Sequence, residues 1–420
     1  MKKGQVFAGV GVIAAVTLFA TTQYKDNSKL ALFLLTGLLL GYILQRGRFG
    51  FAGGVRKIAV TGDGSLSKAL LLLFGITTIG AAGIHYGAFS KGAEAAFRAA
   101  EGVATIPGTG SVSTVNLAFI IGGLLFGIGM ILGGGCASGT LSDSGEGSGR
   151  GMIVLFFFCI GGMLGTWHLP SLKKTFLFEG GFRGYLPDYF GYIGAVLFTL
   201  VLLTGLYVIV KKYESKRKNA GTQNVEEFQE WEQEVAVTKD VATEYKFFSA
   251  ETYHKFFVER WSYYTSAVLI GIMFLFIINT TGSSWGASGP YTHWGVALFS
   301  KFIDFTTIEG FAGSVKVVNS GILNDTGSVR NIGIILGALI CMLLAGKWRL
   351  NFNFKAKDVA FYAAAGILMG YGAKLSGGCN VGALFSGIAN MSVSGWVFLV
   401  LLVLGGLVGV KIVKKFNIPA

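Results

Sequence analysis

The chain has 420 residues, of which 52% are apolar and only 14% are charged. Soluble globular domains carry about 25% charged residues, so this composition excludes that class. The mean hydropathy of +0.60 favours a polytopic membrane protein instead. The net charge of +13 does not indicate a nucleic-acid partner, because the basic residues stand mostly at the ends of apolar runs, as the positive-inside rule requires.

Apolar runs long enough to cross a bilayer recur along most of the chain. The first follows Met1-Lys2-Lys3, a start that also suits a signal peptide, but an uncleaved first span fits the topology below better. We therefore predict an all-α polytopic membrane protein with about nine or ten transmembrane helices. The predicted spans are residues 6–20, 30–44, 67–86, 116–132, 152–167, 190–210, 263–278, 329–344, 359–375 and 395–410.

Basic residues between the spans predict the topology. If the N-terminus is cytoplasmic, four basic groups and the C-terminus fall on the cytoplasmic side. These groups lie within residues 46–57, 211–218, 347–357 and 411–415. The expected division is an N-terminal span and loop (1–29), a first repeat (30–210), a charged cytoplasmic linker without a second domain (211–260) and a second repeat (261–420).

A glycine-rich stretch with one cysteine occurs twice, at residues 123–139 and 366–382. At an offset of 243, nine of the 17 positions are identical, which indicates an internal duplication. The predicted topology puts the first cysteine toward the cytoplasmic side and the second toward the outer side. We therefore expect two inverted repeats, whose broken or re-entrant loops meet near the midplane with short half-helices, as in many transporters.

The chemistry of these stretches centres on Cys136 and Cys379. The neighbouring glycines let the backbone turn sharply and free several amide groups. If a short helix starts just after the cysteine, its N-terminal amides and dipole favour a thiolate and a bound anion. Two such sites facing each other form a short path for a small anion. Close helix packing is the alternative, because glycine beside a small cysteine also lets membrane helices touch.

Other candidate sites are weaker. Cys159 and Cys341 lie within uninterrupted spans and are expected to pack in the core. The cysteines and histidines have no metal-ligand spacing, and no dinucleotide or P-loop motif is complete, so we expect no metal and no cofactor. Asp143 and Glu146 could form a carboxylate pair, although solvation on a cytoplasmic loop explains them as well.

Three motifs resemble those of the YeeE/YedE family of bacterial inner-membrane proteins, a sulphur-transport family that takes up thiosulfate. They are LGYILQRGRFGFAGGVRK (Leu40 to Lys57), GGGCASGTLSDSGEG (Gly133 to Gly147) and GGCNVGALFSGIANMSVSGW (Gly377 to Trp396). The segment WGASGP, Trp285 to Pro290, also fits, so the resemblance spans both halves. It implies two inverted halves around an hourglass-like path, in which thiosulfate passes between cysteine thiols through transient hydrogen bonds.

By position, the resemblance implies Cys136 and Cys379 as the relay thiols. The predicted substrate-binding set is completed by Gly134, Gly135, Ser138, Gly139, Gly377, Gly378, Asn380, Gly382 and Gly50. Gly50 marks a departure, because the family motif has Arg-Phe-Cys where this chain has Arg48-Phe49-Gly50. Either two thiols suffice and Gly50 offers a backbone amide, or the substrate differs from thiosulfate.

The sequence therefore predicts a transporter, and no enzyme, for thiosulfate or a related small sulphur-containing anion. It is placed in the bacterial inner membrane, in contact with lipid, with both termini in the cytoplasm. A cytoplasmic sulphur-accepting protein is a partner that the family implies. The alternatives are a membrane sulphurtransferase that forms a cysteine persulfide, a transporter of a selenium-containing anion, and a purely structural membrane protein.

Overall fold

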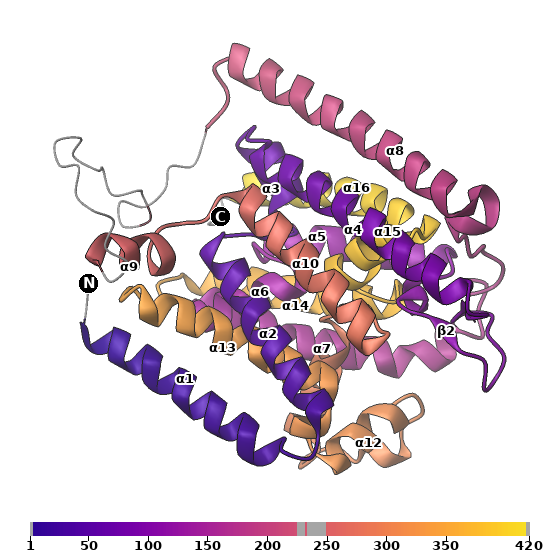
Figure 1. Ribbon diagram of the computed structural model, residues 1–420, viewed down its shortest axis with the longest axis horizontal. Helices are drawn as coiled ribbons and strands as arrows, with labels where there is room; N and C mark the ends of the chain where they lie inside the picture. The colour runs from indigo at the N-terminus through magenta and orange to yellow at the C-terminus, as the bar shows by residue number, and fades with distance from the viewer. Residues whose placement is uncertain (1–2, 225–231, 233–248, 417–420) are drawn as a thin grey trace.

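The computed structural model describes residues 3–224, 232 and 249–416. Within these residues it is mainly helical (Figure 1), and a single pair of two-residue strands runs parallel, β1 (Glu94–Ala95) and β2 (Thr105–Ile106). The helices up to the linker are α1 (Lys3–Gln23), α2 (Ser28–Arg46), α3 (Gly53–Val60), α4 (Ser65–Phe89), η1 (Thr109–Ser111), α5 (Leu117–Leu132), α6 (Ala137–Glu146), α7 (Gly149–Leu172) and α8 (Leu186–Asn219).

The second half also consists of long helices joined by short elements. Its helices are α9 (Ala250–Phe257), α10 (Tyr263–Thr281), α11 (Gly289–Phe299), η3 (Phe305–Thr307), α12 (Ala312–Ser320), η4 (Ile322–Asn324), α13 (Thr326–Leu344), α14 (Ala356–Leu375), the π-helix η5 (Asn380–Phe385), α15 (Ser386–Ala389) and α16 (Val393–Phe416).

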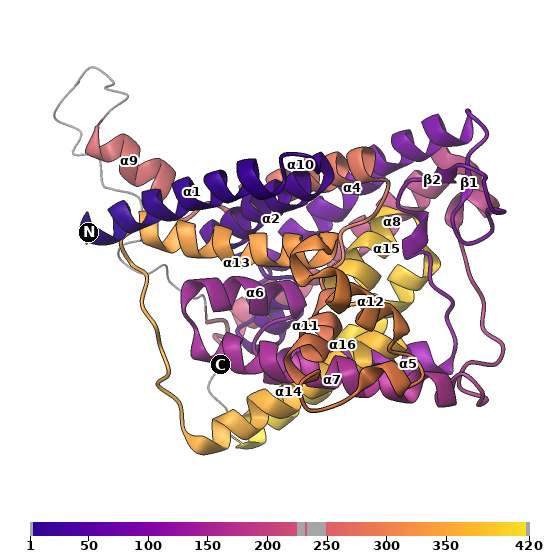
Figure 2. The same ribbon diagram turned by 90° about the horizontal axis from the view of Figure 1, so that it is seen from below.

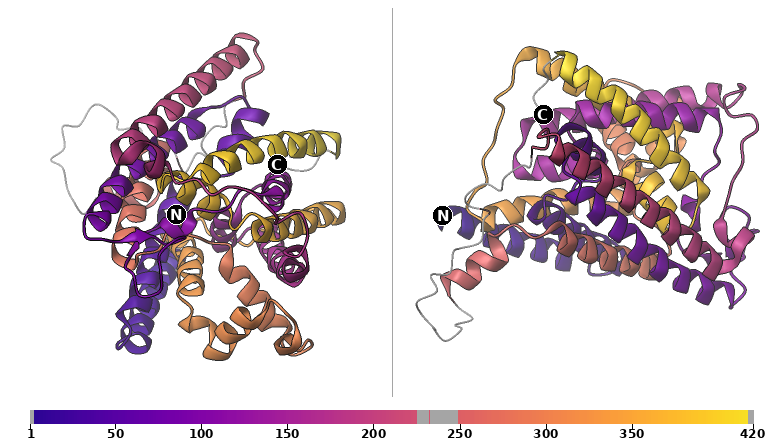
Figure 3. Two further views of the ribbon diagram at one scale, coloured as in Figure 1. Left: turned by 90° about the vertical axis from the view of Figure 1, so that its right-hand side faces the viewer. Right: turned by 90° about the horizontal axis from the view of Figure 1, so that it is seen from above.

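Nine helical segments of the described chain are long and apolar enough to cross a membrane, by length and composition. This confirms the predicted all-α polytopic class. Helix α13 has 72% of its most apolar window buried, whereas α1 has only 6%. The end-on view in Figure 3 accordingly places α1 and α8 at edges of the bundle.

Polar residues stand where several spans begin. The side chain of Asn27 accepts a hydrogen bond from the amide of Leu30 at the start of α2. Asn116 accepts one from Phe119 at the start of α5 in the same way. Each satisfies an amide that has no partner inside its helix. These caps set the first turns of two helices that reach the site.

Glycines bring the central helices into backbone contact. A Cβ at Gly122 would lie 2.7 Å from the carbonyl oxygen of Gly372, and one at Gly129 would lie 2.8 Å from that of Ala365. The order of these contacts shows that α5 and α14 run antiparallel. The two helices that precede the cysteines, both labelled in Figure 2, therefore run toward their cysteines in opposite directions. That each belongs to an inverted repeat stays a prediction.

Helix α8 differs from the predicted span. It contains a kink at Gly191, where φ is +63°, and it continues to Asn219, beyond the expected boundary at residue 210. Lys211 to Lys218 are thus helical, because the long basic side chains favour helix once the apolar part has ended. Much of the predicted linker, residues 225–231 and 233–248, lies outside the described residues.

Candidate functional site

The two cysteines have nearly the same backbone geometry. Gly134 and Gly377, each two residues before a cysteine, have φ angles of +74° and +71°. Cys136 then has φ −97° and ψ −173°, and Cys379 has φ −111° and ψ −170°. Each cysteine is the residue before a helix, α6 in one case and the π-helix η5 in the other. We call residues 134–136 and 377–379 the cysteine breaks.

Glycine is needed at these breaks for two reasons. The left-handed conformation of Gly134 and Gly377 is strained for other residues. A Cβ at Gly378 would also lie 2.9 Å from the amide nitrogen of Ala383. By contrast, a Cβ at Gly135 or Gly382 would meet its nearest neighbour at 3.7 or 3.8 Å, an ordinary contact, and one at Gly139 would point into open space. Packing therefore does not require glycine at these three positions.

Cys136 is fully buried and surrounded by hydrogen-bond donors. Its sulfur lies 3.4 Å from the hydroxyl of Ser138, and the backbone N–H groups of Gly139 and Ala52 are directed at it. One donor therefore comes from the first turn of α6 and another from the segment after Gly50. Donors of this kind stabilise an anion placed at a helix N-terminus.

Cys379 is also fully buried, and its neighbour Asn380 is only partly satisfied. The Asn380 amide nitrogen donates to the sulfur of Met130 at 3.5 Å. Its carbonyl oxygen is buried without a hydrogen-bond partner among the described residues. Because buried polar atoms usually have partners, Asn380 keeps an acceptor for a hydrogen-bond donor, but this oxygen cannot itself bind an anion that only accepts hydrogen bonds.

The fold brings the two breaks together. Helix α6 contacts the π-helix η5, and the Cys136 and Cys379 thiols are close enough to interact electrostatically. Tyr291 of α11 is within electrostatic reach of both. Its hydroxyl donates to the carbonyl oxygen of Ala137 at 2.6 Å and lies 3.0 Å from the hydroxyl of Thr140. Tyr291 thus holds the first turn of α6 in place.

Trp285 lies in the same region. It is fully buried, and its ring contacts Phe51, at 6.0 Å between centroids, and Phe385 of the π-helix, at 6.3 Å. Its indole N–H has no hydrogen-bond partner within the part of the chain that the structure describes. The sequence motif WGASGP pointed to this segment, but nothing in the sequence assigned a role to the indole or to Tyr291.

A cavity of about 290 Å³ reaches Cys136, and we call it the Cys136 cavity. Gly50 lines it, as the sequence predicted for a site residue, together with Gly134, Gly135 and Gly139. Its charged lining residues are Arg48, Arg56, Lys57, Asp143, Glu232 and Arg260. The walls thus combine basic groups with carboxylates.

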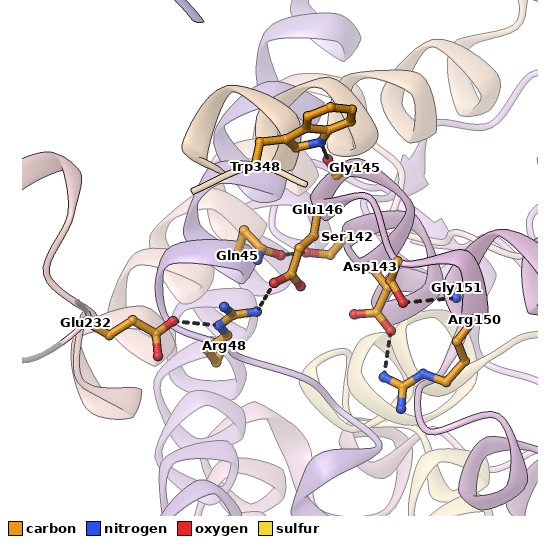
Figure 4. A network of polar contacts seen from close by, with 11 residues as sticks. Gln45, Arg48, Ser142, Asp143, Gly145, Glu146, Arg150, Gly151, Glu232 and Trp348 are labelled. Atoms are coloured by element: carbon orange, nitrogen blue, oxygen red, sulfur yellow. Dashed lines mark hydrogen bonds and ion pairs between the residues drawn. The ribbon is translucent and has the colours of Figure 1, made fainter. Parts of the chain in front are cut away.

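Arg48 organises the wall of this cavity (Figure 4). Its guanidinium donates to Glu146 at 2.6 Å and to Glu232 at 2.9 Å. Burial lowers the pKa of Arg48, but the two facing carboxylates outweigh it, so the pKa lies above its ordinary value. Arg48 also has a left-handed φ of +48°, which is uncommon outside glycine. The sequence showed this motif but not its role.

Other contacts in Figure 4 attach α6 to its surroundings. The Ser142 hydroxyl donates to Gln45 of α2 at 2.8 Å, and Arg150 lies 3.4 Å from Asp143. Asp143 and Glu146 thus form ion pairs with different arginines. Among the described residues, no three histidine, cysteine or acidic side chains gather as a metal site would require.

A second cavity, of about 550 Å³, reaches the other break at Ser376 and Gly377. We call it the Gly377 cavity. It lies at the N-terminal end of α5, where Asn116 and Phe119 line it, whereas the Cys136 cavity lies beyond the C-terminal end of α5. The two cavities therefore approach the paired breaks from opposite ends. Cys159 and Cys341 line neither cavity and are buried.

Nine apolar spans in the described residues, with one cavity that reaches Cys136 and another that reaches Gly377 beside the second cysteine, define a polytopic membrane protein with the layout of a transporter. Residues 46–408 match the model of the family described as Sulphur transport. The chain therefore belongs to that family, which confirms the resemblance that the sequence motifs indicated.

Two similar proteins cover nearly the whole chain. The thiosulfate transporter TsuA of Escherichia coli is 26% identical over 381 residues, or 89% of this chain and 91% of that protein. The thiosulfate transporter TsuA of Spirochaeta thermophila is 26% identical over 385 residues, 89% and 95% of the two chains. The probable transporter YedE of Escherichia coli is 25% identical over 168 residues, covering 40% of this chain and 42% of its own.

Proposed function

We propose that this protein carries thiosulfate, or a related small sulphur-containing anion, across the bacterial inner membrane by passing it between the thiols of Cys379 and Cys136. The observation that carries the proposal is the matched geometry of the two breaks, each of which is reached by its own cavity. The relatives named as thiosulfate transporters support the substrate.

The path runs from the Gly377 cavity through the region of the two thiols to the Cys136 cavity. A dianion in hydrocarbon faces a desolvation cost of the order of tens of kcal/mol. Fixed donors along the path offset it. They are the amides of Gly139 and Ala52 and the hydroxyl of Ser138 near Cys136, and the indole N–H of Trp285, which is unpartnered among the described residues.

Each thiol acts as a donor that exchanges one hydrogen bond at a time. A thiol is a weak donor, so it holds the anion loosely enough to release it to the next group. Conduction needs sites that bind firmly enough to admit an ion and weakly enough to let it leave. No covalent bond to sulphur is required in this scheme, and the protein is no enzyme.

The proposed topology has both termini in the cytoplasm and the two halves as inverted repeats. The antiparallel contact of α5 with α14 supports the inversion. Helix α1 begins, and α8 and α16 end, at the same end of the molecule (Figure 1), and α8 and α16 carry basic residues in their last turns. This is the end that the positive-inside rule assigns to the cytoplasm. Lipid surrounds the bundle, and a soluble sulphur acceptor meets the anion on this side.

The test uses proteoliposomes and thiosulfate labelled either in its terminal sulphur or in its sulphonate sulphur. Intact transport predicts that both labels enter the lumen in equal amounts, and that the protein gains no mass. A sulphurtransferase would leave one sulphur on Cys136 or Cys379 and separate the two labels. If neither label enters liposomes that contain the protein faster than liposomes without it, transport of thiosulfate is rejected.

A further inference from the structure

Three basic side chains line the Gly377 cavity. Lys173 follows α7, Arg183 lies in the next loop, and Lys374 is in the last turn of α14, three residues before Gly377. Among the described residues that line this cavity there is no aspartate or glutamate. The Cys136 cavity differs, because there Asp143 and Glu232 share the walls with basic groups.

Lys374 is half-buried, whereas Lys173 and Arg183 are exposed. Its Cβ and Cγ lie against Gly165 of α7, where a Cβ on the glycine would come within 2.8 Å. In the described part of the chain, its ammonium group has no hydrogen bond and no ion pair. His293 of α11 is within electrostatic reach and supplies no negative charge. An enclosed cation without a counter-ion is costly unless something pairs with it.

The matching position of the other glycine-rich stretch carries no lysine. At the repeat offset of 243, Lys374 corresponds to Ile131. Ile131 occupies the last turn of α5 and is buried. An apolar side chain therefore serves the same position of the helix in the first half. The lysine distinguishes the second break, which is the one that opens into the cavity without carboxylates among its described lining residues.

We propose that Lys374 is the counter-ion of the incoming anion, and that it makes the Gly377 cavity the capture site for a small sulphur oxyanion. This inference rests on the proposed function and adds the residue that binds the substrate first. Lys173 and Arg183 at the same cavity raise the local concentration of anions. At the other end, the carboxylates of Asp143 and Glu232 share the cavity walls with the basic groups, so the anion is held less firmly and leaves.

The central experiment measures the half-saturating thiosulfate concentration for uptake into proteoliposomes. Lys374→Met removes the charge and keeps an unbranched side chain. We expect the half-saturating concentration to rise about tenfold or more, since a hydrogen bond to a charged group is worth at least that factor. Lys374→Arg should stay within about threefold of the wild type because it keeps the charge. Unchanged half-saturation in Lys374→Met overturns the proposal.

Lys91→Gln is the matched control. Lys91 is exposed, lies in the same loop region as the residues 96–116 that line the cavity, and does not line the cavity itself. It should behave as the wild type.

If Lys374→Met does not reach the membrane, the double variant Lys173→Gln and Arg183→Gln tests the same cavity without changing α14. This double variant should raise the half-saturating thiosulfate concentration several-fold and make it depend less on ionic strength. If neither quantity changes, the proposal is overturned.

A binding measurement separates this inference from the relay. In purified Cys379→Ala protein, uptake should be absent but thiosulfate should still raise the melting temperature, because the capture site is intact. Adding Lys374→Met should remove that rise. If Cys379→Ala blocks uptake and the double variant still responds to thiosulfate like the single one, the relay stands and the role of Lys374 is refuted. If Cys379→Ala transports normally, and the added Lys374→Met removes the thiosulfate-dependent rise in melting temperature, the relay fails and the capture site stands.

Discussion

Gly134 and Gly377 adopt the same left-handed backbone conformation 243 residues apart, with φ angles of +74° and +71°. Each comes two residues before a buried cysteine. Their surroundings differ, because a Cβ at Gly134 would lie 2.7 Å from the Arg150 guanidinium, whereas one at Gly377 would lie 3.3 Å from the Ser113 hydroxyl. One break is thus enclosed and the other has more room.

This difference predicts an order among alanine variants. Gly377→Ala should cost about 1–2 kcal/mol of stability from backbone strain alone. Gly134→Ala should cost more, because Arg150 must also move. Thermal unfolding of the detergent-purified proteins measures both. Gly83→Ala in α4, which has a helical φ and no neighbour within 4 Å, is the control, and equal losses in all three variants would contradict the role of the breaks.

Gly50 offers space for the thiol that the family motif has at this position. The nearest atom to a Cβ there is the Gly53 nitrogen at 4.0 Å, and φ is not positive. We therefore expect Gly50→Cys to fold like the wild type and to react with a small maleimide through the Cys136 cavity. The native cysteines are buried and give the background rate. Failure to react faster than wild type would show that the cavity is closed to reagents of this size.

Trp285→Phe isolates the indole N–H. The phenyl ring keeps the contacts with Phe51 and Phe385, so the melting temperature should change little. If the N–H donates to the passing anion, the initial uptake rate at a fixed low thiosulfate concentration should fall about tenfold. This is the factor expected for the loss of one hydrogen bond to a charged group. Trp396→Phe is the control, because that indole N–H also lacks a partner among the described residues, while the ring contacts with Phe51 and Phe385 belong to Trp285. Equal uptake by both variants would remove Trp285 from the path.

The Arg48–Glu146 pair should contribute to stability. Arg48→Ala leaves Glu146 and Glu232 without their shared cation, and we expect a loss of about 1–2 kcal/mol, since the Arg48 and Glu146 side chains are about one quarter exposed and solvent screens the pair. In a double-mutant cycle with Glu146→Gln, the coupling energy measures the pair itself. Arg98–Asp188, which is more exposed, should give less than about 0.5 kcal/mol. If the coupling energy of Arg98–Asp188 exceeds that of Arg48–Glu146, the stabilising role of the Arg48 pair is contradicted.

Much of the architecture could be read from the sequence because membrane spans are set by local composition. The runs at 116–132 and 359–375 became α5 and α14, and the glycine-rich breaks follow them as expected. The short helix considered after the first cysteine is present as the ten-residue helix α6. Its residues are mostly small and polar, and it is held by contacts from distant segments such as Gln45 and Tyr291.

The residues that sequence reasoning missed are defined by tertiary contacts. Arg48 belongs to a recognised motif, but its partners are 98 and 184 positions away. Trp285 became a candidate because its indole N–H has no partner in the described structure. Lys374 became one because it lines the Gly377 cavity. Comparison of the two glycine-rich stretches did contain one usable signal. Lys374 stands where the first stretch has Ile131, and a lone charge at a helix end beside a cysteine break departs from the shared pattern.

The relay between the thiols is tested most directly by thiosulfate flux into proteoliposomes that hold equal amounts of folded protein. Cys136→Ala and Cys379→Ala should each reduce the flux to that of empty liposomes, while the double variant Cys159→Ala and Cys341→Ala should keep the wild-type rate. Wild-type flux through either Cys136→Ala or Cys379→Ala would contradict the account.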